Sequence, residues 1–268
     1  VGAGLTVING GTITGGNGYG GQANAITFTG GANTLRFLNG TSGLNGNIGV
    51  AGSLTFDQSG TDTAVANMIT GTGSVAKTGS AMVTLSGANT YTGGTAINAG
   101  ILSISSDANL GAASGALTFN GGTLQKTGGG LSTARNVVLN SGGGTFDFQN
   151  LITITGNLTG TGGLTVTNSL GGSGGTLSLN GNNTYFGATH IAQGVISAAS
   201  NTALSANSAY QLDSGTALVI GGAVNATVGS LAGSGQVKLN DPFTFQAGNL
   251  TTGFDNTSTT FSGIFAGA

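Results

Sequence analysis

The stretch Leu85-Ser-Gly-Ala-Asn89-Thr90-Tyr91-Thr92-Gly93-Gly94-Thr95-Ala96-Ile97-Asn98-Ala99-Gly100 decides the fold, because it recurs 94 residues later. There the chain reads Leu179-Asn-Gly-Asn-Asn183-Thr184-Tyr185-Phe186-Gly187-Ala188-Thr189-His190-Ile191-Ala192-Gln193-Gly194. Upstream, Gly71–Val75 matches Gly160–Leu164, and Gly233–Val237 is a third copy of that piece. Near-identical strand-turn units in tandem favour a solenoid over a Greek-key sandwich.

Short runs that alternate apolar and polar residues lie between Gly, Asn and Ser along the whole chain. Examples are Leu5–Ile8, Leu54–Phe56, Ile101–Ile104 and Leu177–Leu179. Alternation with a period of two, bounded by turn residues, indicates β-strands. Three strands and three turns give a coil of roughly 20 to 25 residues, so the chain makes about 12 coils, which at ~4.8 Å each stack to ~55–60 Å. The predicted fold is an all-β, right-handed parallel β-helix with three strands in each coil.

The composition agrees with this fold and excludes several others. The 268 residues include 55 Gly, one Pro (Pro242), no Cys and no Glu. Long soluble helices need Glu, Lys and Arg in quantity, so an all-α protein is excluded. The net charge is −2 and no basic stripe is present, which excludes a phosphate-dominated nucleic-acid partner. The absence of Cys suits a protein that crosses an oxidising periplasm unfolded.

Few residues are candidates for chemistry. β-Helix lyases and hydrolases need clustered carboxylates as acid–base pairs or calcium ligands. Here the closest pair is Asp57 and Asp62, and we interpret the aspartates as turn caps and residues of solvated faces. Asp213 and Asp241 can approach across one coil only if the register allows it. We therefore predict no catalytic, cofactor-binding or metal-binding residues, no cofactor and no enzymatic activity.

The remaining candidates have structural interpretations. His190 corresponds to Ala96 in the first copy, so the fold does not require a histidine there, and we expect it at the surface. Tyr91 and Tyr185 recur at equivalent positions, which indicates rings packed over a turn or stacked along the coils. The glycine clusters are not followed by a helix or a Lys-Ser/Thr pair, so they predict turns and loops rather than phosphate sites. These clusters are Gly128–Gly130, Gly142–Gly144 and Gly171–Gly175.

The pattern Lys77-Thr78-Gly79, Val83–Thr95, Ile97 and Ala99–Leu102 resembles the passenger-associated transport repeat, or autotransporter-associated β-strand repeat, of type V secretion passengers. Ile8–Gly16 resembles the coils found N-terminal to that repeat. The second copy departs from the pattern at Phe186, Ala188 and His190. With their flanks the copies cover about two-thirds of the chain. The resemblance implies an exported passenger whose own outer-membrane β-barrel follows Ala268, located at the bacterial cell surface, attached to the outer membrane, or secreted.

We predict one β-helix segment, 1–268, in four parts. These are N-terminal coils (1–66), a first transport-repeat unit (67–155), a second (156–240) and the start of a further, truncated unit (241–268). The predicted role is a rigid stalk or adhesion scaffold whose repeats aid its own secretion and extracellular folding. Its partner is then a host-cell or surface receptor or glycan. Two alternatives are a filament subunit that self-associates end to end or laterally, and a carbohydrate-active enzyme.

Overall fold

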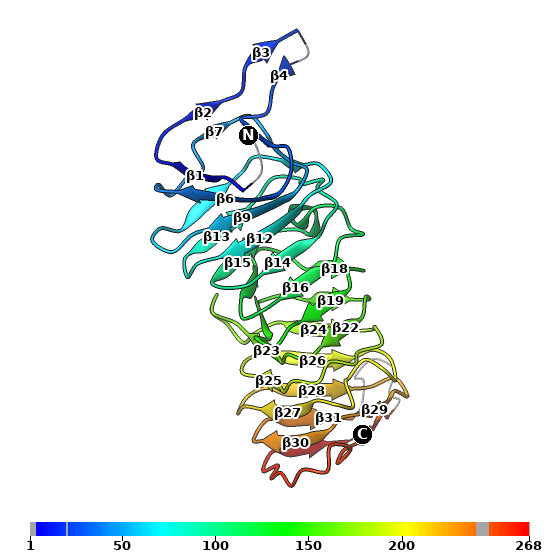
Figure 1. Ribbon diagram of the computed structural model, residues 1–268. Helices are drawn as coiled ribbons and strands as arrows, with labels where there is room; N and C mark the ends of the chain where they lie inside the picture. Colours follow the sequence, from blue (N-terminus) through cyan, green and yellow to red (C-terminus); the bar gives the residue numbers. More distant parts are fainter. Residues whose placement is uncertain (1–3, 20, 240–246, 268) are drawn as a thin grey trace. The chain divides into compact units, whose positions relative to one another are not determined.

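The computed structural model describes residues 4–19, 21–239 and 247–267. It confirms the predicted class, a right-handed parallel β-helix, with about 10 turns where the sequence predicted about 12. Within the described ranges, the only helix is a four-residue 3₁₀ turn at Asp107–Leu110. The chain divides into two compact units, Val1–Gln125 and Lys126–Ala268. Figure 1 labels most of the strands of each unit.

Unit 1 contains two long parallel sheets, a shorter one, and two small strand pairs. The first long sheet has the order β1 (Thr6–Asn9), β6 (Ala32–Phe37), β9 (Ser53–Asp57), β12 (Ser74–Thr78), β14 (Thr95–Ile97), β16 (Leu117–Phe119). The second has the order β10 (Thr63–Val65), β13 (Met82–Leu85), β15 (Ile101–Ile104), β17 (Thr123–Lys126). The third has the order β11 (Ile69–Thr70), β8 (Ile48–Val50), β5 (Ile26–Phe28). The small pairs are β2 (Ile13–Thr14) with β7 (Leu44–Asn45), and the antiparallel β3 (Asn17–Gly18) with β4 (Gly21–Gln22).

Unit 2 repeats the same construction. One sheet has the order β18 (Leu131–Thr133), β21 (Ile152–Ile154), β24 (Thr176–Leu179), β26 (Val195–Ala198), β28 (Ala217–Ile220), β31 (Gln236–Lys238), β33 (Ile264–Ala266). A second has the order β20 (Gly144–Phe148), β23 (Leu164–Thr167), β25 (Thr189–Ile191), β27 (Ala209–Leu212), β30 (Ser230–Gly233). Two further pairs are β19 (Val137–Leu139) with β22 (Leu158–Gly160), and β29 (Asn225–Thr227) with β32 (Asn249–Thr251).

Inward side chains form columns that run from coil to coil. In unit 2, Leu177 pairs in register with Ile196, which pairs with Leu218, and all three are fully buried. Burial of apolar area contributes roughly 25 cal/mol per Å², so each added coil is stabilised by the coils beside it. The period-two alternation read from the sequence is therefore confirmed as an inward–outward alternation in these strands.

Three corners carry the repeated Gly-x-Gly piece, and one geometric constraint explains all three. Gly71, Gly160 and Gly233 have φ values of 113°, 114° and 105°. A Cβ on any of them would lie 2.0–2.1 Å from a backbone carbonyl oxygen of the preceding coil. The left-handed conformation and the close approach both require glycine. The sequence match among Gly71–Val75, Gly160–Leu164 and Gly233–Val237 therefore marks one type of corner that occurs three times.

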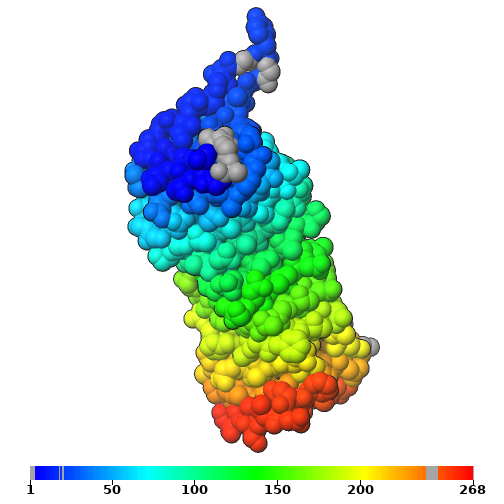
Figure 2. Space-filling view, in the orientation of Figure 1, coloured from blue at the N-terminus to red at the C-terminus, as the bar shows by residue number. Residues whose placement is uncertain are grey.

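The N-terminal part of unit 1 departs from regular coiling. Residues between β1 and β5 leave the coil, and the β3–β4 hairpin stands away from it as a narrow projection (Figure 2). Tyr19, next to β3, is completely exposed. The sequence resemblance predicted regular coils over Ile8–Gly16, but only β1 and the two-residue β2 pair with later strands there.

Candidate functional site

The repeated motif places one buried asparagine between three successive coils of unit 1. The Oδ1 atom of Asn89 accepts a hydrogen bond from the backbone N–H of Ile69, 20 residues earlier, at 2.7 Å. Its Nδ2 donates to the carbonyl oxygen of Asn109, 20 residues later, at 2.6 Å. The side chain thus satisfies one buried donor and one buried acceptor, which would otherwise be left unpaired.

Tyr91 and Thr95 complete the motif inside the same coil. The Tyr91 ring is fully buried, and its hydroxyl lies 2.6 Å from Thr95 Oγ1. Thr95 Oγ1 donates to the carbonyl oxygen of Leu110 at 3.2 Å. Because Thr95 donates its single hydroxyl proton to that carbonyl, Tyr91 is the donor in the hydrogen bond between Tyr91 and Thr95. The prediction of a ring packed over a turn or stacked along the coils is corrected here, since the ring lies within the interior and is held by hydrogen bonds.

The second copy reproduces this arrangement in unit 2. Asn183 accepts from the backbone N–H of Leu158 at 2.7 Å and donates to the carbonyl oxygen of Ala203 at 2.5 Å. The hydroxyl of Tyr185 lies 2.6 Å from Thr189 Oγ1. We call the asparagine, tyrosine and threonine of each copy the coil clamp: Asn89, Tyr91 and Thr95 in the first, Asn183, Tyr185 and Thr189 in the second.

A wider hydroxyl network surrounds the second clamp. Tyr210 Oη lies 3.2 Å from Tyr185 Oη, and Ser208 Oγ lies 2.8 Å from Thr189 Oγ1. All four side chains are buried. Burial raises the pKa of Tyr185, and it raises the pKa of Tyr210 still further, so both hydroxyls stay protonated donors.

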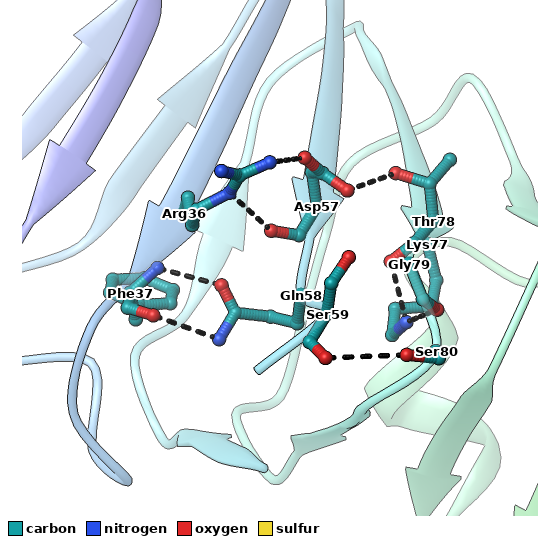
Figure 3. Close-up of polar contacts among 9 residues, drawn as sticks. All are labelled: Arg36, Phe37, Asp57, Gln58, Ser59, Lys77, Thr78, Gly79 and Ser80. Atoms are coloured by element: carbon teal, nitrogen blue, oxygen red, sulfur yellow. Dashed lines mark hydrogen bonds and ion pairs between the residues drawn. The ribbon is translucent and has the colours of Figure 1, made fainter. Parts of the chain in front are cut away.

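Two lysines point into the coils. Lys77 stands in an inward column between Phe56 and Ile97 and is fully buried. Its Nζ donates to the carbonyl oxygens of Thr78 and Gly79 at 2.6 and 2.7 Å (Figure 3). Burial lowers the pKa of Lys77 to about 8, because desolvation penalises the charged form.

Lys126 repeats the same device in unit 2. Its Nζ donates to the carbonyl oxygens of Thr127 and Gly129, both at 2.6 Å, and burial lowers its pKa as well. In both places the ammonium donates to two backbone carbonyl oxygens at a corner of the coil. The glycine cluster Gly128–Gly130 is part of this corner.

Asp57 and Asp62 have separate structural partners in unit 1. Asp57 forms an ion pair with Arg36 in the preceding coil, and its Oδ1 accepts from Thr78 Oγ1 at 3.2 Å (Figure 3). The hydrogen bond from Arg36 lowers the pKa of Asp57. Asp62 Oδ1 accepts from the backbone N–H of Met82 at 2.7 Å. Each carboxylate therefore links neighbouring coils, a role that the sequence interpretation as turn caps and solvated faces did not include.

A further amide joins coils beside Asp57. Gln58 is buried, and its Oε1 accepts from the Phe37 N–H at 2.7 Å while its Nε2 donates to the Phe37 carbonyl at 3.1 Å (Figure 3). Its Nε2 also donates to Thr63 Oγ1 at 2.8 Å. Ser80 Oγ donates to the carbonyl of Ser59 in the same region.

His190 and Asp213 meet on the outer side of unit 2. His190 Nε2 lies 3.0 Å from Asp213 Oδ2, and the side chains are 42% and 44% exposed. The sequence considered Asp213 with Asp241, but Asp241 lies outside the described residues. Of the other glycine clusters, Gly142–Gly144 leads into β20 and Gly171–Gly175 leads into β24.

No group of three or more His, Cys, Asp or Glu side chains among the described residues can hold a metal ion. No helix in the same ranges is long and apolar enough to cross a membrane.

Sequence reasoning missed the clamp asparagines and the interior lysines. The signal for the lysines was present, since Lys77-Thr78-Gly79 recurs as Lys126-Thr127-Gly128. The signal for Asn89 and Asn183 was their identity in two copies whose outward residues differ. In neither case does alternation mark these residues as inward, because they are polar.

Comparison with known protein families matches the two segments that contain the coil clamps. Residues 75–104 and 173–198 match the family described as the passenger-associated transport repeat, and each stretch contains one coil clamp. Over 255 residues, 86% of its length, the chain is 34% identical to the "Adhesin BmaC autotransporter" of Brucella suis biovar 1 (strain 1330). The chain spans 7% of the length of that relative. No solved structure matches the chain.

A parallel β-solenoid with two passenger-associated transport repeats defines the passenger class of exported protein. The chain is a stretch of an autotransporter passenger domain. Its place is accordingly surface-exposed or secreted.

Proposed function

We propose that this passenger segment is a non-enzymatic, adhesin-like scaffold whose transport repeats help it to fold outside the cell. The name of its relative supports an adhesive role, and the solenoid supports a scaffold that presents surface residues on stacked coils. The observation that carries the proposal is the coil clamp, present once in each matched repeat.

The clamp gives the transport repeat a physical task. Asn89 and Asn183 can close only when the coil before and the coil after are both in register. Once closed, a coil cannot be drawn back through a narrow pore without breaking both hydrogen bonds and re-exposing its apolar column. We therefore propose that the repeats promote coil closure outside the cell and so favour complete export. We also propose that the exported passenger either stays attached to the outer membrane through its own barrel or is released.

Secretion of the full-length polypeptide tests this role. An Asn89→Ala, Asn183→Ala double variant is expected to lower the surface-exposed fraction, measured by protease accessibility on intact cells. Asn98→Ala, which changes an exposed asparagine in the same repeat, is the control. Equal surface amounts for the double variant and the control would contradict the assignment.

Adhesion needs its own measurement. Beads coated with the 268-residue chain are expected to bind host cells or abiotic surfaces more than uncoated beads do. Growth of light scattering with concentration would instead favour the filament alternative. Release of reducing ends from a glycan panel would favour the carbohydrate-active enzyme.

A further inference from the structure

A small hollow opens at one corner of unit 2, where three successive coils come together. Its volume is about 160 Å³, and it is lined by residues 172–173, 192–194 and 214–216. Pockets for drug-sized ligands measure ~300–1,000 Å³, so this hollow admits one small chemical unit. Gly172 and Gly215 border open space, since a Cβ on either would meet no atom within 4 Å.

The lining is polar and retains free hydrogen-bonding capacity. Gln193 Oε1 accepts from the backbone N–H of Asn168 at 3.0 Å, which fixes the carboxamide. Among the described residues, no acceptor pairs with its Nε2, and the hydroxyls of Ser173 and Ser214 have no partner. Thr216 Oγ1 donates to the Asp213 carbonyl at 2.7 Å and holds the turn that carries Ser214.

The His190–Asp213 pair lies beside this hollow along the chain. Asp213 directly precedes Ser214, and His190 lies two residues before Ala192. Only Oδ2 of Asp213 is engaged, by His190 at 3.0 Å, so within the described part of the chain Oδ1 remains an unpaired acceptor. A carboxylate oxygen forms hydrogen bonds about twice as strong as a neutral acceptor does.

The two repeats differ where the hollow forms and agree where the clamp forms. His190 and Gln193 replace Ala96 and Ala99, whereas Asn, Tyr and Thr of the clamp are identical. Gln193 and His190 each make one contact with a neighbouring coil, and the outward position of Gln193 leaves its Nε2 available to a ligand.

We propose that this corner binds one neutral sugar residue of a glycan chain. Hydroxyl-rich rings require interleaved donors and acceptors, which Ser173, Gln193 and Ser214 provide in the lining. Asp213 is outside the lining but directly precedes Ser214, and we assign its carboxylate as a further acceptor for the sugar. The Asp213 charge opposes sialylated, sulfated or phosphorylated groups, and no lysine or arginine lines the hollow. This inference rests on the proposed adhesive function and specifies its ligand class.

The test is a glycan array followed by affinity measurement on the glycans that bind. The 268-residue chain is compared with Asp213→Asn, which removes the charged acceptor, and Ser214→Trp, which fills the hollow. Ser132→Trp adds the same indole at an exposed strand position elsewhere in unit 2 and serves as control. All four proteins should melt at similar temperatures, because the substituted side chains are at least partly exposed.

Neutral glycans are expected to bind the wild-type chain and the control, with affinity at least about tenfold weaker in both site variants. Absence of binding to any glycan, binding confined to anionic glycans, or equal affinity in all four proteins would overturn the proposal. The bead assay distinguishes failure of this sugar site from failure of the proposed adhesive function. If bead adhesion is unchanged in the site variants, this site is refuted and the adhesive function stands. If the chain binds glycans but its beads do not adhere, the adhesive function is refuted and this site stands.

Discussion

Replacing Asn89 by alanine tests the coil clamp directly. The substitution leaves the Ile69 N–H and the Asn109 carbonyl without partners, and both residues are buried. An unsatisfied buried backbone group costs ~1–3 kcal/mol, so the loss in the free energy of unfolding should total ~2–6 kcal/mol. Asn89→Asp keeps the acceptor but sets a carboxylate oxygen against the Asn109 carbonyl, so it should destabilise the chain at least as much.

Urea unfolding followed by far-ultraviolet circular dichroism measures the total effect. Hydrogen exchange locates it, because the lost protection should concentrate in the coils that contain Ile69, Asn89 and Asn109. Asn98→Ala is the matched control, since its side chain is exposed and its effect should stay within about 0.5 kcal/mol. If Asn89→Ala loses no more stability than Asn98→Ala, the clamp does not hold the coils and the assignment of the repeat fails.

Three further predictions concern the interior. The unfolded Lys77 has a pKa near 10.5 and the folded one about 8, so stability of unit 1 should rise by up to ~3 kcal/mol as pH increases through this window. Hydrogen exchange should show this rise, and Lys77→Met should abolish it. Above pH 10 the unfolded tyrosines release protons that Tyr185 and Tyr210 retain, so unit 2 should lose stability; alkaline unfolding that is identical in Tyr185→Phe would contradict this. Leu85→Asp should bury an unpaired charge and unfold the adjoining coils, and an unchanged thermal melt would count against the register of β13.

The sequence predicted the fold where side-chain chemistry alternates and failed where polar groups face inward. Leu177 and Leu179 were recognisable as interior residues because Ser178 between them faces outward. Lys77 sits at an equally inward position, yet its charge suggests solvent. The buried ammonium is favourable because its Nζ donates to the corner carbonyls of Thr78 and Gly79, contacts that the sequence pattern does not reveal.

The candidate sites were harder to foresee because they depend on the number of residues in each coil. Asp57 meets Arg36 and Thr78, each 21 residues away, since this is the local coil length. Asp213 meets His190 at a separation of 23 residues. A shift of one residue in either coil would turn these side chains to the opposite face, and composition alone does not set that count.

Polar residues inside a solenoid specify what aliphatic columns cannot. Leu54 and Val75 stack in successive coils of unit 1, and a slip by one whole coil would bury similar apolar area. Asn89 removes this degeneracy, because its two hydrogen bonds require one particular N–H before it and one particular carbonyl after it. Register is then reset at each clamp, so the coils between clamps can accept insertions. The loop at 171–175 lies upstream of Asn183, and the second clamp still closes with the coils on both sides of it.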